Sequence, residues 1–432
     1  MLQPFRTEPF TDFSKPENEA AFRAALEKVK AEMGRSFPLV IGDQRLLLDQ
    51  TFSSINPSRP SEVLGTFSKG DVSHADMAVA TALEAFKTWQ YTSVADRARY
   101  LLRAATELRR RKHEFSATMV LEVGKSWAEA DADTAEAIDF MEYYARQAMR
   151  VADSSHLLLP NPGEQVGLYY IPLGVGIVIP PWNFPLAIPT GMMTAALVAG
   201  NAVILKPAEP SPWIAWKLCE LFWDQGLPPG VLNFVSGPGR STGAHMVAHP
   251  KTRFIAFTGS RDVGLNIFEQ ASKVPPGQIW LKRTILEMGG KDAVVVDETA
   301  DLEAAAQGIV TSAFGFQGQK CSAGSRAIIV GDVYDQVANR VVELTRKLQI
   351  AAPDVGPHVD IGPVVNLDSM QKIMGYIEVG TQEGELLLGG NPVETAEGGY
   401  FIPPTIFGDV ASNARIAQEE IFGPVLALLR AR

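Results

Sequence analysis

Apolar residues in the first third of the chain recur at the spacing of a helix. Residues 17–33 form one such stretch, and a longer tract covers about residues 75–144. In that tract Leu101, Ala105 and Leu108 fall on one face when the chain is wound at about 3.6 residues per turn. The pattern therefore predicts helices that each bury one side against a core.

From residue 174 onward, short runs of apolar and β-branched residues alternate with helical stretches. The first series has predicted strands at 174–179, 202–205, 232–235 and 254–257, with helices from 190 to 199 and from 212, 241 and 262. In a second series, the predicted strands are 293–296 and 327–330, with a helix at 302–314. Repeated strand–helix–strand units imply parallel sheets. We therefore expect an α/β fold with two open-sheet domains that meet near residues 284–290.

Residues 165–205 contain no Asp, Glu, Lys, Arg or His, which is unusual outside a membrane span. Five prolines interrupt this stretch, and its longest proline-free piece, 190–205, is shorter than the about 20 residues that a spanning helix needs. We therefore expect no membrane partner. Within residues 153–170, the sequence Pro-Asn-Pro-Gly lies between two apolar runs, and this pattern predicts a β-hairpin.

The composition is that of a folded globular protein. The chain has 432 residues, of which 46% are hydrophobic and 20% charged, and its net charge of −10 disfavours nucleic acid as a partner. Two cysteines, Cys219 and Cys321, exclude a disulfide framework and favour the reducing cytoplasm. Cys219 lies among apolar residues, as a structural thiol does, whereas Cys321 is surrounded by glycine and small polar residues.

Several strand ends carry residues that suit a dinucleotide. Lys206 and Glu209 follow a predicted strand, where a carboxylate can accept hydrogen bonds from ribose hydroxyls; an exposed loop ion pair is the alternative. Glycine-rich turns at 237–243 and 257–264 each join a strand to a helix, where free backbone N–H groups favour phosphate. Neither turn matches a standard phosphate-binding motif, but together with Lys206 and Glu209 they favour a dinucleotide site.

Cys321, in the segment FGFQGQKCSAG, is the best candidate for a nucleophile. We expect Lys320 beside it, together with a helix start, to lower the pKa of the thiol. Glu287 precedes Met-Gly-Gly at a strand end and can serve as a general base, and Asn183 in PWNFP can donate to an oxyanion. The structural alternatives are an inert buried thiol, a domain-boundary ion pair and an Asx turn, respectively.

His245 and His249 are one helical turn apart, which is a spacing found between metal ligands. The residue after His245 is not Glu, so the zinc-protease motif is absent, and neither a further cysteine nor an acidic cluster accompanies the pair. We therefore predict a surface helix here and no metal site. A cysteine protease is disfavoured as well, because none of the six histidines belongs to a motif recognisable beside Cys321.

Six motifs, PWNFP, KPAE, FTGS, EMGG, FGFQGQKCSA and EEIFGPV, occur in this order between residues 181 and 425. With them the chain resembles the NAD(P)-dependent aldehyde dehydrogenase superfamily over nearly its whole length. The resemblance implies two Rossmann-type open parallel-sheet domains and a β-hairpin oligomerisation arm. The implied parts are an NAD-binding domain at 1–152 and 171–286, the arm at 153–170, and a catalytic domain at 287–432. A homo-oligomer is expected for the full-length protein.

The resemblance also implies roles for individual residues. Cys321 corresponds to the nucleophile that forms a thiohemiacetal and then a thioester, Asn183 to an oxyanion donor, and Glu287 to the base that activates the hydrolytic water. A carboxylate at Glu209 would repel a 2′-phosphate, so NAD is the expected cofactor. The implied cofactor-binding residues are Lys206, Glu209, Gly259, Ser260, Glu420 and Phe422. The implied substrate contacts are Phe184 and Ser322.

Four further segments, PFRTEP, EAIDFMEYYAR, WLKR and QGQKCSAGSR, are similar to those of family members that oxidise L-glutamate γ-semialdehyde to L-glutamate in proline degradation. Members of the family continue beyond the EEIFGPV motif with a segment that completes the catalytic domain and anchors the substrate. We therefore expect the C-terminal part of that domain to be missing here, and residues 1–432 alone to be poorly active. The alternatives are a dehydrogenase of another aldehyde, a non-catalytic NAD-binding fragment, and a thiol hydrolase that needs no NAD.

Overall fold

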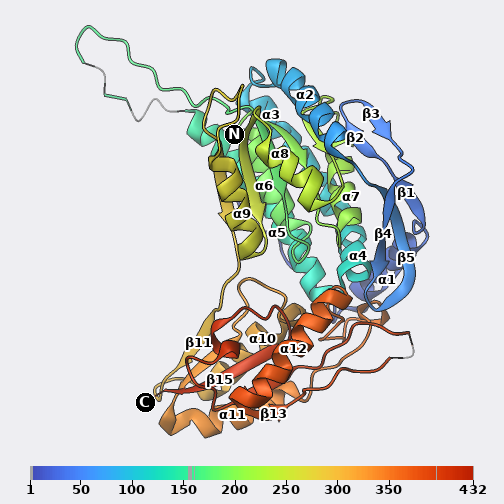
Figure 1. The fold of residues 1–432 in the computed structure, drawn as a ribbon, viewed down its shortest axis with the longest axis vertical. Helices are drawn as coiled ribbons and strands as arrows, with labels where there is room; N and C mark the ends of the chain where they lie inside the picture. The colour runs from blue at the N-terminus through green and yellow to red at the C-terminus, as the bar shows by residue number, and fades with distance from the viewer. Residues whose placement is uncertain (1–2, 154–157, 160, 396, 432) are drawn as a thin grey trace.

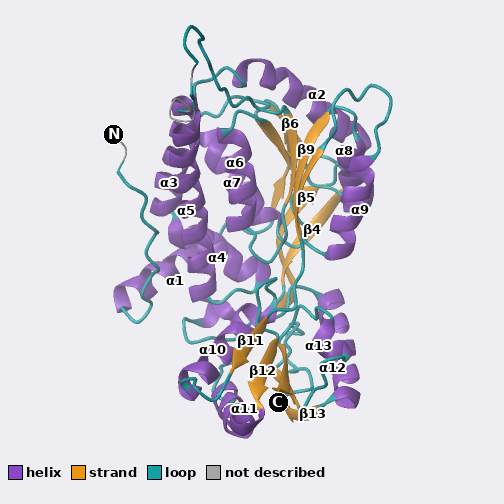
Figure 2. Ribbon diagram, turned by 90° about the vertical axis from the view of Figure 1, so that its left-hand side faces the viewer, coloured by secondary structure: helices purple, strands orange, loops and turns teal. Residues whose placement is uncertain are grey.

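The computed structural model describes residues 3–153, 158, 159, 161–395 and 397–431. Figure 1 shows two bodies, a larger one formed by residues before about 288 and a smaller one formed by the residues after it. Each body contains an open, mostly parallel sheet covered by helices on both faces, as the alternation of strands and helices predicted. Figure 2 shows this layering edge-on, with α3, α5, α6 and α7 on one side of the larger sheet and α2, α8 and α9 on the other.

The larger body contains most of the helices in the described part of the chain. They are α1 (Pro16–Lys30), α2 (Val72–Trp89), α3 (Val94–Arg110), α4 (Lys112–Val123), α5 (Trp127–Ala152), α6 (Ala187–Val198), α7 (Pro212–Asp224), α8 (Ala244–Ala248) and α9 (Arg261–Ser272). The smaller body contains α10 (Leu302–Phe314), α11 (Gly331–Thr345), α12 (Leu367–Glu383) and α13 (Arg415–Gln418). The tract predicted as helical over 75–144 is thus divided into α2, α3, α4 and α5.

Three sheets are present in the described residues. The seven-stranded sheet has the order β10 (Arg283–Glu287), β9 (Thr252–Thr258), β6 (Val175–Ile179), β7 (Ala202–Leu205), β8 (Leu232–Phe234), β2 (Leu39–Ile41) and β3 (Gln44–Leu46). The five-stranded sheet has the order β11 (Ala293–Val296), β12 (Arg326–Val330), β15 (Val425–Ala431), β14 (Thr405–Gly408) and β13 (Glu385–Leu388). A three-stranded sheet, not predicted from the sequence, has the order β1 (Arg35–Phe37), β5 (Arg59–Ser68) and β4 (Thr51–Asn56).

The predicted strands of the larger sheet are confirmed, and their burial explains their composition. All four residues of β7 are buried, because a parallel strand in the middle of a sheet is covered on both faces. The helix predicted from residue 190 begins earlier than expected, since α6 starts at Ala187 and Thr190 lies inside it. The end of that helix was predicted correctly: Gly200 has a φ of +95°, a conformation that glycine adopts without strain.

The passage from one body to the other lies between β10 and β11. β10 was not predicted as a strand of the first sheet; it pairs in parallel with β9, and its end at Glu287 brings that residue to the edge facing the smaller body. Its alternating exposure, with Ile285 62% exposed, is typical of an edge strand rather than of a buried one. The predicted meeting point near 284–290 therefore includes the end of a strand as well as the connection.

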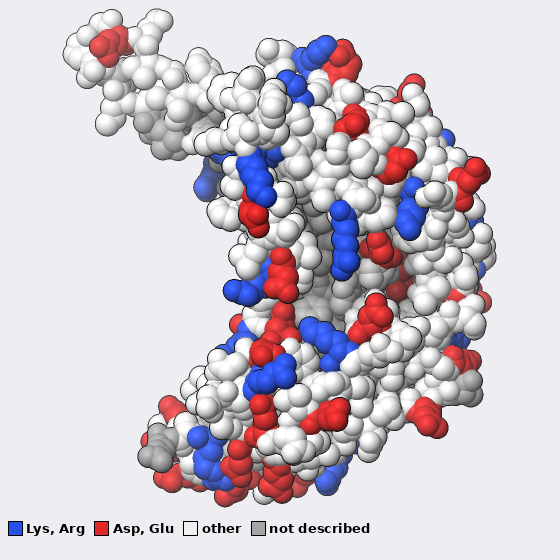
Figure 3. Space-filling view, viewed as in Figure 1, with Lys and Arg blue, Asp and Glu red and all other residues white. Residues whose placement is uncertain are grey.

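The predicted β-hairpin at 153–170 is not seen as a pair of strands. Residues 158, 159 and 161–174 carry no strand, while 154–157 and 160 lie outside the described residues. In Figure 1 this segment extends away from the larger body, and Figure 3 shows that it carries few charged side chains. An isolated two-stranded ribbon is only marginally stable, which explains why a hairpin pattern alone did not produce paired strands.

No helix in the described part of the chain is long and apolar enough to span a bilayer. The uncharged stretch from 165 to 205 instead supplies β6, α6 and β7, whose side chains fill the interior of the larger body. Its apolar character is thus explained by burial between helices and sheet.

Candidate active site

A cavity of about 400 Å³ lies at the carboxyl ends of β6, β7 and β9, where the larger body faces the smaller one. β6 and β9 are neighbours in the sheet, although β7 and β8 lie between them in the sequence. This is the point at which the strand order reverses, and open α/β sheets bind ligands there. The predicted residues that line the cavity are Asn183, Lys206, Gly259, Ser260, Cys321, Glu420 and Phe422.

Asn183 lies in the segment between β6 and α6, and its side chain is only 4% exposed. Its Nδ2 donates a hydrogen bond to the backbone oxygen of Gln319, at 2.9 Å, two residues before Cys321. A primary amide has two N–H groups, so the second remains available to a ligand oxygen in the cavity. The Asn183 side chain therefore joins its own segment directly to the segment that carries Cys321. It does not form the Asx turn that was the structural alternative.

The segment before Cys321 is backbone-strained. Phe316 and Gln317 both have positive φ angles, 48° and 56°, which cost residues with side chains about 1 kcal/mol or more each. The Gln317 amide holds this shape by donating from Nε2 to the oxygens of Gly124, at 3.1 Å, and Pro363, at 2.8 Å. Such strain persists only where the surroundings enforce it, and it is common next to catalytic residues.

Cys321 is half-buried in the cavity, and its environment contains groups that raise the pKa of the thiol and groups that lower it. Burial raises the pKa of Cys321, and the carboxylates of Glu287 and Glu420 raise it further. Hydrogen bonds from the backbone N–H groups of Cys321 and Ser322 act in the opposite sense. Cys219, by contrast, is fully buried in α7, where burial raises its pKa well above the ordinary value, as expected for a structural thiol.

The prediction that Lys320 lowers the pKa of Cys321 is wrong. The Nζ atom of Lys320 lies 2.6 Å from Oε1 of Glu129 on α5, and this carboxylate engages the ammonium group. Adjacent residues in an irregular segment point in different directions, so nearness in sequence did not give nearness of the side chains.

Glu287 and Glu420 approach the thiol from two different segments. Glu287 ends β10 with an exposed side chain, and its backbone oxygen accepts a hydrogen bond from Gly259 N at 3.0 Å. Glu420 Oε1 accepts from Gly290 N at 3.2 Å, and a Cβ on Gly289 would lie 2.1 Å from Glu420 Oε2. Gly289 therefore leaves room for the Glu420 carboxylate, and Gly290 holds it through a hydrogen bond.

Lys206 follows the end of β7 and lines the same cavity. Its side chain is almost fully buried, and Nζ donates to the backbone oxygen of Pro207 at 3.1 Å. Burial lowers the pKa of Lys206, and the nearby carboxylate of Glu209 opposes that effect. The carbon chain lies against Gly243, where an added Cβ would come within 3.2 Å of Lys206 Cδ, so the first glycine-rich turn, 237–243, makes space for the lysine.

Four predicted residues lie outside the lining of the cavity: Phe184, Glu209, Glu287 and Ser322. Glu209 and Ser322 are exposed at its margins, and the ring of Phe184 is covered by a lysine, Lys125. Residues that the sequence analysis missed include Trp182, which lines the cavity and packs edge-on against Phe422 with ring centroids 5.6 Å apart. Its place next to Asn183 in PWNFP was the available signal.

Comparisons with known proteins agree with this geometry. Residues 47–432 match the model described as "Aldehyde dehydrogenase family". The chain is 57% identical over 432 residues to a protein named 1-pyrroline-5-carboxylate dehydrogenase from Geobacillus thermodenitrificans, covering 100% of this chain and 83% of that one. A protein of the same name from Bacillus cereus is 52% identical with the same coverage.

Solved structures give the same result. A 1-pyrroline-5-carboxylate dehydrogenase from Thermus with bound NAD superposes with a TM-score of 0.97 at 50% identity, over 100% of this chain and 83% of the other. Proline utilization A from Bdellovibrio bacteriovorus superposes with a TM-score of 0.93 at 42% identity, over 99% of this chain and 44% of that larger chain.

Proposed function

Because this chain belongs to the aldehyde dehydrogenase family, we propose that it oxidises L-glutamate γ-semialdehyde to L-glutamate with NAD, the second step of proline degradation. The observation that carries the proposal is one cavity that is lined both by Cys321 and Asn183 and by Lys206 and Ser260. The candidate nucleophile and the candidate nucleotide-binding residues thereby share one cavity. The relatives with this printed activity match the chain over its full length.

The chemistry follows from the groups at the Cys321 end. The Sγ atom, after its proton passes to solvent, attacks the aldehyde carbon and forms a carbon–sulfur bond, and the aldehyde oxygen becomes an oxyanion. The free N–H of Asn183 and the backbone N–H of Cys321 are the donors that stabilise this charge. Bound NAD supplies the acceptor for the hydride that leaves the same carbon. The product of that step is a thioester on Cys321.

Glu287 completes the cycle in this proposal. Its exposed carboxylate, at the end of β10, accepts a proton from a water molecule as that water attacks the thioester carbon. The carbon–sulfur bond then breaks, glutamate leaves with its new carboxylate, and the thiolate is restored. The Glu287 carboxylate raises the pKa of Cys321, which supports a role for it beside the reacting sulfur.

The other end of the cavity fits a dinucleotide. Lys206 and Glu209 flank the carboxyl end of β7, where they can bind ribose hydroxyls, and Ser260 precedes the first turn of α9, whose N–H groups suit a pyrophosphate. Glu420 and Phe422 line the same cavity and are assigned to the nicotinamide ribose. Glu209 disfavours NADP, because its carboxylate repels a 2′-phosphate.

The test is NADH formation from L-glutamate γ-semialdehyde, with the Cys321→Ala variant as the blank. Activity above that blank, and higher than with simple aliphatic aldehydes, supports the proposal. Equal rates on all aldehydes would favour the second candidate, a dehydrogenase of another aldehyde. That candidate is retained because Phe184 and Ser322, the two implied substrate contacts, lie outside the cavity lining. Ester cleavage that needs no NAD would indicate a thiol hydrolase instead.

The proposal includes a homo-oligomer in the cytoplasm. The exposed apolar side chains of Leu159, Tyr169 and Tyr170 lie on the segment that the family resemblance assigns to an oligomerisation arm, and they are 95%, 83% and 64% exposed. Apolar groups on an extended segment favour association with another chain. Analytical ultracentrifugation of the purified protein would detect the assembly, and a monomer at all concentrations would contradict it.

A further inference from the structure

Lys125 is a fully buried lysine that lies beside the candidate active site without lining it. It belongs to the short turn between α4 and α5, and its side chain has no exposed surface. Its Nζ atom lies 3.9 Å from the centroid of the Phe184 ring and 4.6 Å from that of the Phe316 ring. An ammonium group that contacts two aromatic rings in a desolvated place gains about 2 kcal/mol from such contacts.

The two rings come from the two segments that carry the proposed chemistry. Phe184 directly follows Asn183, and Phe316 precedes Cys321 in the strained turn after α10. The Asn183 amide already bonds to the Gln319 backbone at 2.9 Å. The ammonium of Lys125 is thus a second connection between the oxyanion segment and the nucleophile segment.

The partner of Lys125 holds the oxyanion segment from its other end. Asp133, also fully buried, accepts from Lys125 Nζ through Oδ2 at 2.8 Å. Its Oδ1 accepts from the backbone N of Ala187 at 2.6 Å, which is the first residue of α6. Burial raises the pKa of Asp133, and the charge of Lys125 opposes this change. The residues between Asn183 and α6 are therefore fixed through Asp133 and through Phe184.

The same turn and the first part of α5 contact the nucleophile segment at two more places. The backbone oxygen of Gly124 accepts from Gln317 Nε2 at 3.1 Å, and Glu129 pairs with Lys320 at 2.6 Å. These contacts flank the Lys125 ammonium along the chain. The geometry gives one rigid element, the α4–α5 turn, that supports the segments on both sides of the proposed reacting carbon.

We propose that Lys125 is a positioning residue, which holds the Asn183 segment and the Cys321 segment in register through Phe184 and Phe316. A buried ion pair contributes little net stability, because desolvation offsets the attraction, so stability alone does not account for this pair. When the two segments are held in register, the oxyanion donors and the Cys321 sulfur can contact the aldehyde at the same time. The kinetic part of this inference rests on the proposed dehydrogenase function, whereas the structural part does not.

The test variant is Lys125→Met combined with Asp133→Asn. Methionine keeps most of the volume, and asparagine keeps an oxygen that can accept from Ala187 N while removing the otherwise unpaired buried charge. We expect kcat to fall about 10- to 100-fold relative to the wild type, as for lost orientation of reacting groups. The dissociation constant for NAD should stay within about twofold, because the lysine lies away from the Lys206 end.

Hydrogen exchange provides a readout that does not depend on turnover. In the double variant, backbone amides of residues 183–188 and 314–321 should exchange at least about tenfold faster than in the wild type, while those of β6 and β7 keep their rates. An absence of wild-type NAD reduction would contradict the proposed function and leave this exchange measurement decisive for Lys125.

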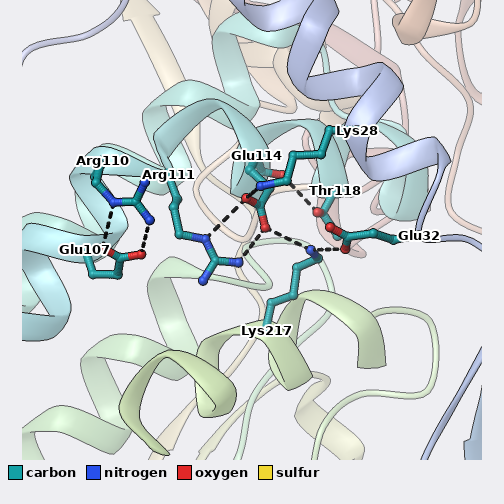
Figure 4. Close-up of polar contacts among 8 residues, drawn as sticks. All are labelled: Lys28, Glu32, Glu107, Arg110, Arg111, Glu114, Thr118 and Lys217. Atoms are coloured by element: carbon teal, nitrogen blue, oxygen red, sulfur yellow. Dashed lines mark hydrogen bonds and ion pairs between the residues drawn. The ribbon is translucent and has the colours of Figure 1, made fainter. Parts of the chain in front are cut away.

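A matched control is available in Lys217→Met. Lys217 is also a buried lysine with an aromatic neighbour, since its Nζ lies 5.5 Å from the Trp213 ring, and it pairs with Glu32 at 2.6 Å and Glu114 at 3.1 Å (Figure 4). It lies on α7 and has no contact with either segment. This control should lose thermal stability but keep kcat within about twofold. Unchanged exchange in both segments of the double variant, or equal losses of kcat in both proteins, would overturn the inference.

Discussion

Charged side chains gather in two parts of this molecule, and they are arranged in opposite ways. Around Glu114 on α4, each charge has a partner: the carboxylate accepts from Lys28 at 2.6 Å, from Lys217 at 3.1 Å, and from Arg111 (Figure 4). Beside Cys321, in contrast, the carboxylates of Glu287 and Glu420 both oppose ionisation of the thiol. The ion pairs around Glu114 fix helices to one another. The carboxylates beside Cys321 instead disfavour its thiolate, so that stabilising this charge is left to a ligand.

The pKa directions express the same contrast. The cations around Glu114 lower its pKa to about 2 although burial acts to raise it, so the folded protein stabilises its charged form. Burial and like charge raise the pKa of Cys321, so the folded protein disfavours the reactive form of the sulfur. Functional sites commonly keep such unfavourable arrangements, because their groups are matched to a reaction rather than to the resting state.

The largest effect is expected from Cys321→Ala. It should reduce NAD-dependent turnover at least about 10³-fold, since no other group forms the covalent intermediate. The midpoint of thermal unfolding should change little, because the side chain is half-buried and unpaired with any cation. Cys219→Ala is the control: it should keep turnover and lose stability, as a fully buried side chain in α7 does when truncated. Inactivation by the control alone would reverse the assignment of the two thiols.

Glu287→Gln should lower steady-state turnover about 10²-fold or more, because it removes the base but leaves the nucleophile. The first turnover should still release NADH rapidly, so a burst followed by a slow phase is expected in stopped-flow measurements. If the burst disappears together with the steady state, Glu287 acts before thioester hydrolysis and the proposed role is wrong.

Glu114→Gln tests the other region. Removing the shared carboxylate takes the ion-pair partner from Arg111 and leaves Lys217 with Glu32 alone, which should lower the free energy of unfolding by about 3 kcal/mol in urea titrations. The activity of the folded fraction should remain within about twofold. A variant that keeps its stability but loses turnover would remove the distinction between the two regions.

Acid should reduce the difference in unfolding free energy between the wild type and Glu114→Gln. A carboxyl whose folded pKa is depressed stabilises the protein above its unfolded pKa, and that contribution is lost as the pH falls toward the folded value of about 2. Urea titrations at about pH 7 and about pH 3 should therefore show the difference in unfolding free energy shrinking by about half or more. A constant difference would indicate that lost packing, not lost charge, destabilises the variant.

The smallest effect is expected from Arg110→Ala. Arg110 pairs with Glu107 at 2.6 Å at the edge of the cluster around Glu114, but its side chain is 70% exposed. Solvent screens such pairs, so neither the urea midpoint nor turnover should change measurably. A clear loss of stability would show that the cluster extends further than its buried members.

The sequence predicted those parts of the fold whose pattern is local. The bounds of β6, β7 and α10 were predicted closely, from apolar runs and from the glycines next to them. The strands β1, β2 and β3 were missed because each has only three residues, too few for a periodic pattern, and because, unlike β8, they do not belong to an alternation of strands and helices. β1 and β2 become strands by pairing with the distant strands β5 and β8, and β3 pairs with its neighbour β2.

The site shows the same limit. Cys321, Asn183 and Lys206 were found because chemistry-bearing residues stand at strand ends or in glycine-rich segments, and the structure brings all three to one cavity. Lys125 was missed because a lone lysine between two helices carries no pattern; its position depends on rings from two distant segments. The direction of Lys320 was misjudged for the same reason, since the partner Glu129 lies on α5.

The position of β15 has a consequence for how the protein forms. Residues 425–431 make the middle strand of the five-stranded sheet and pair in parallel with β12 on one side and β14 on the other. All strands of the seven-stranded sheet, in contrast, precede residue 288. During synthesis the larger sheet can close well before the smaller one, whose two halves stay apart until this late segment emerges. The strands that precede Asn183, Lys206 and Ser260 can thus pair before the sheet that follows Cys321 is complete.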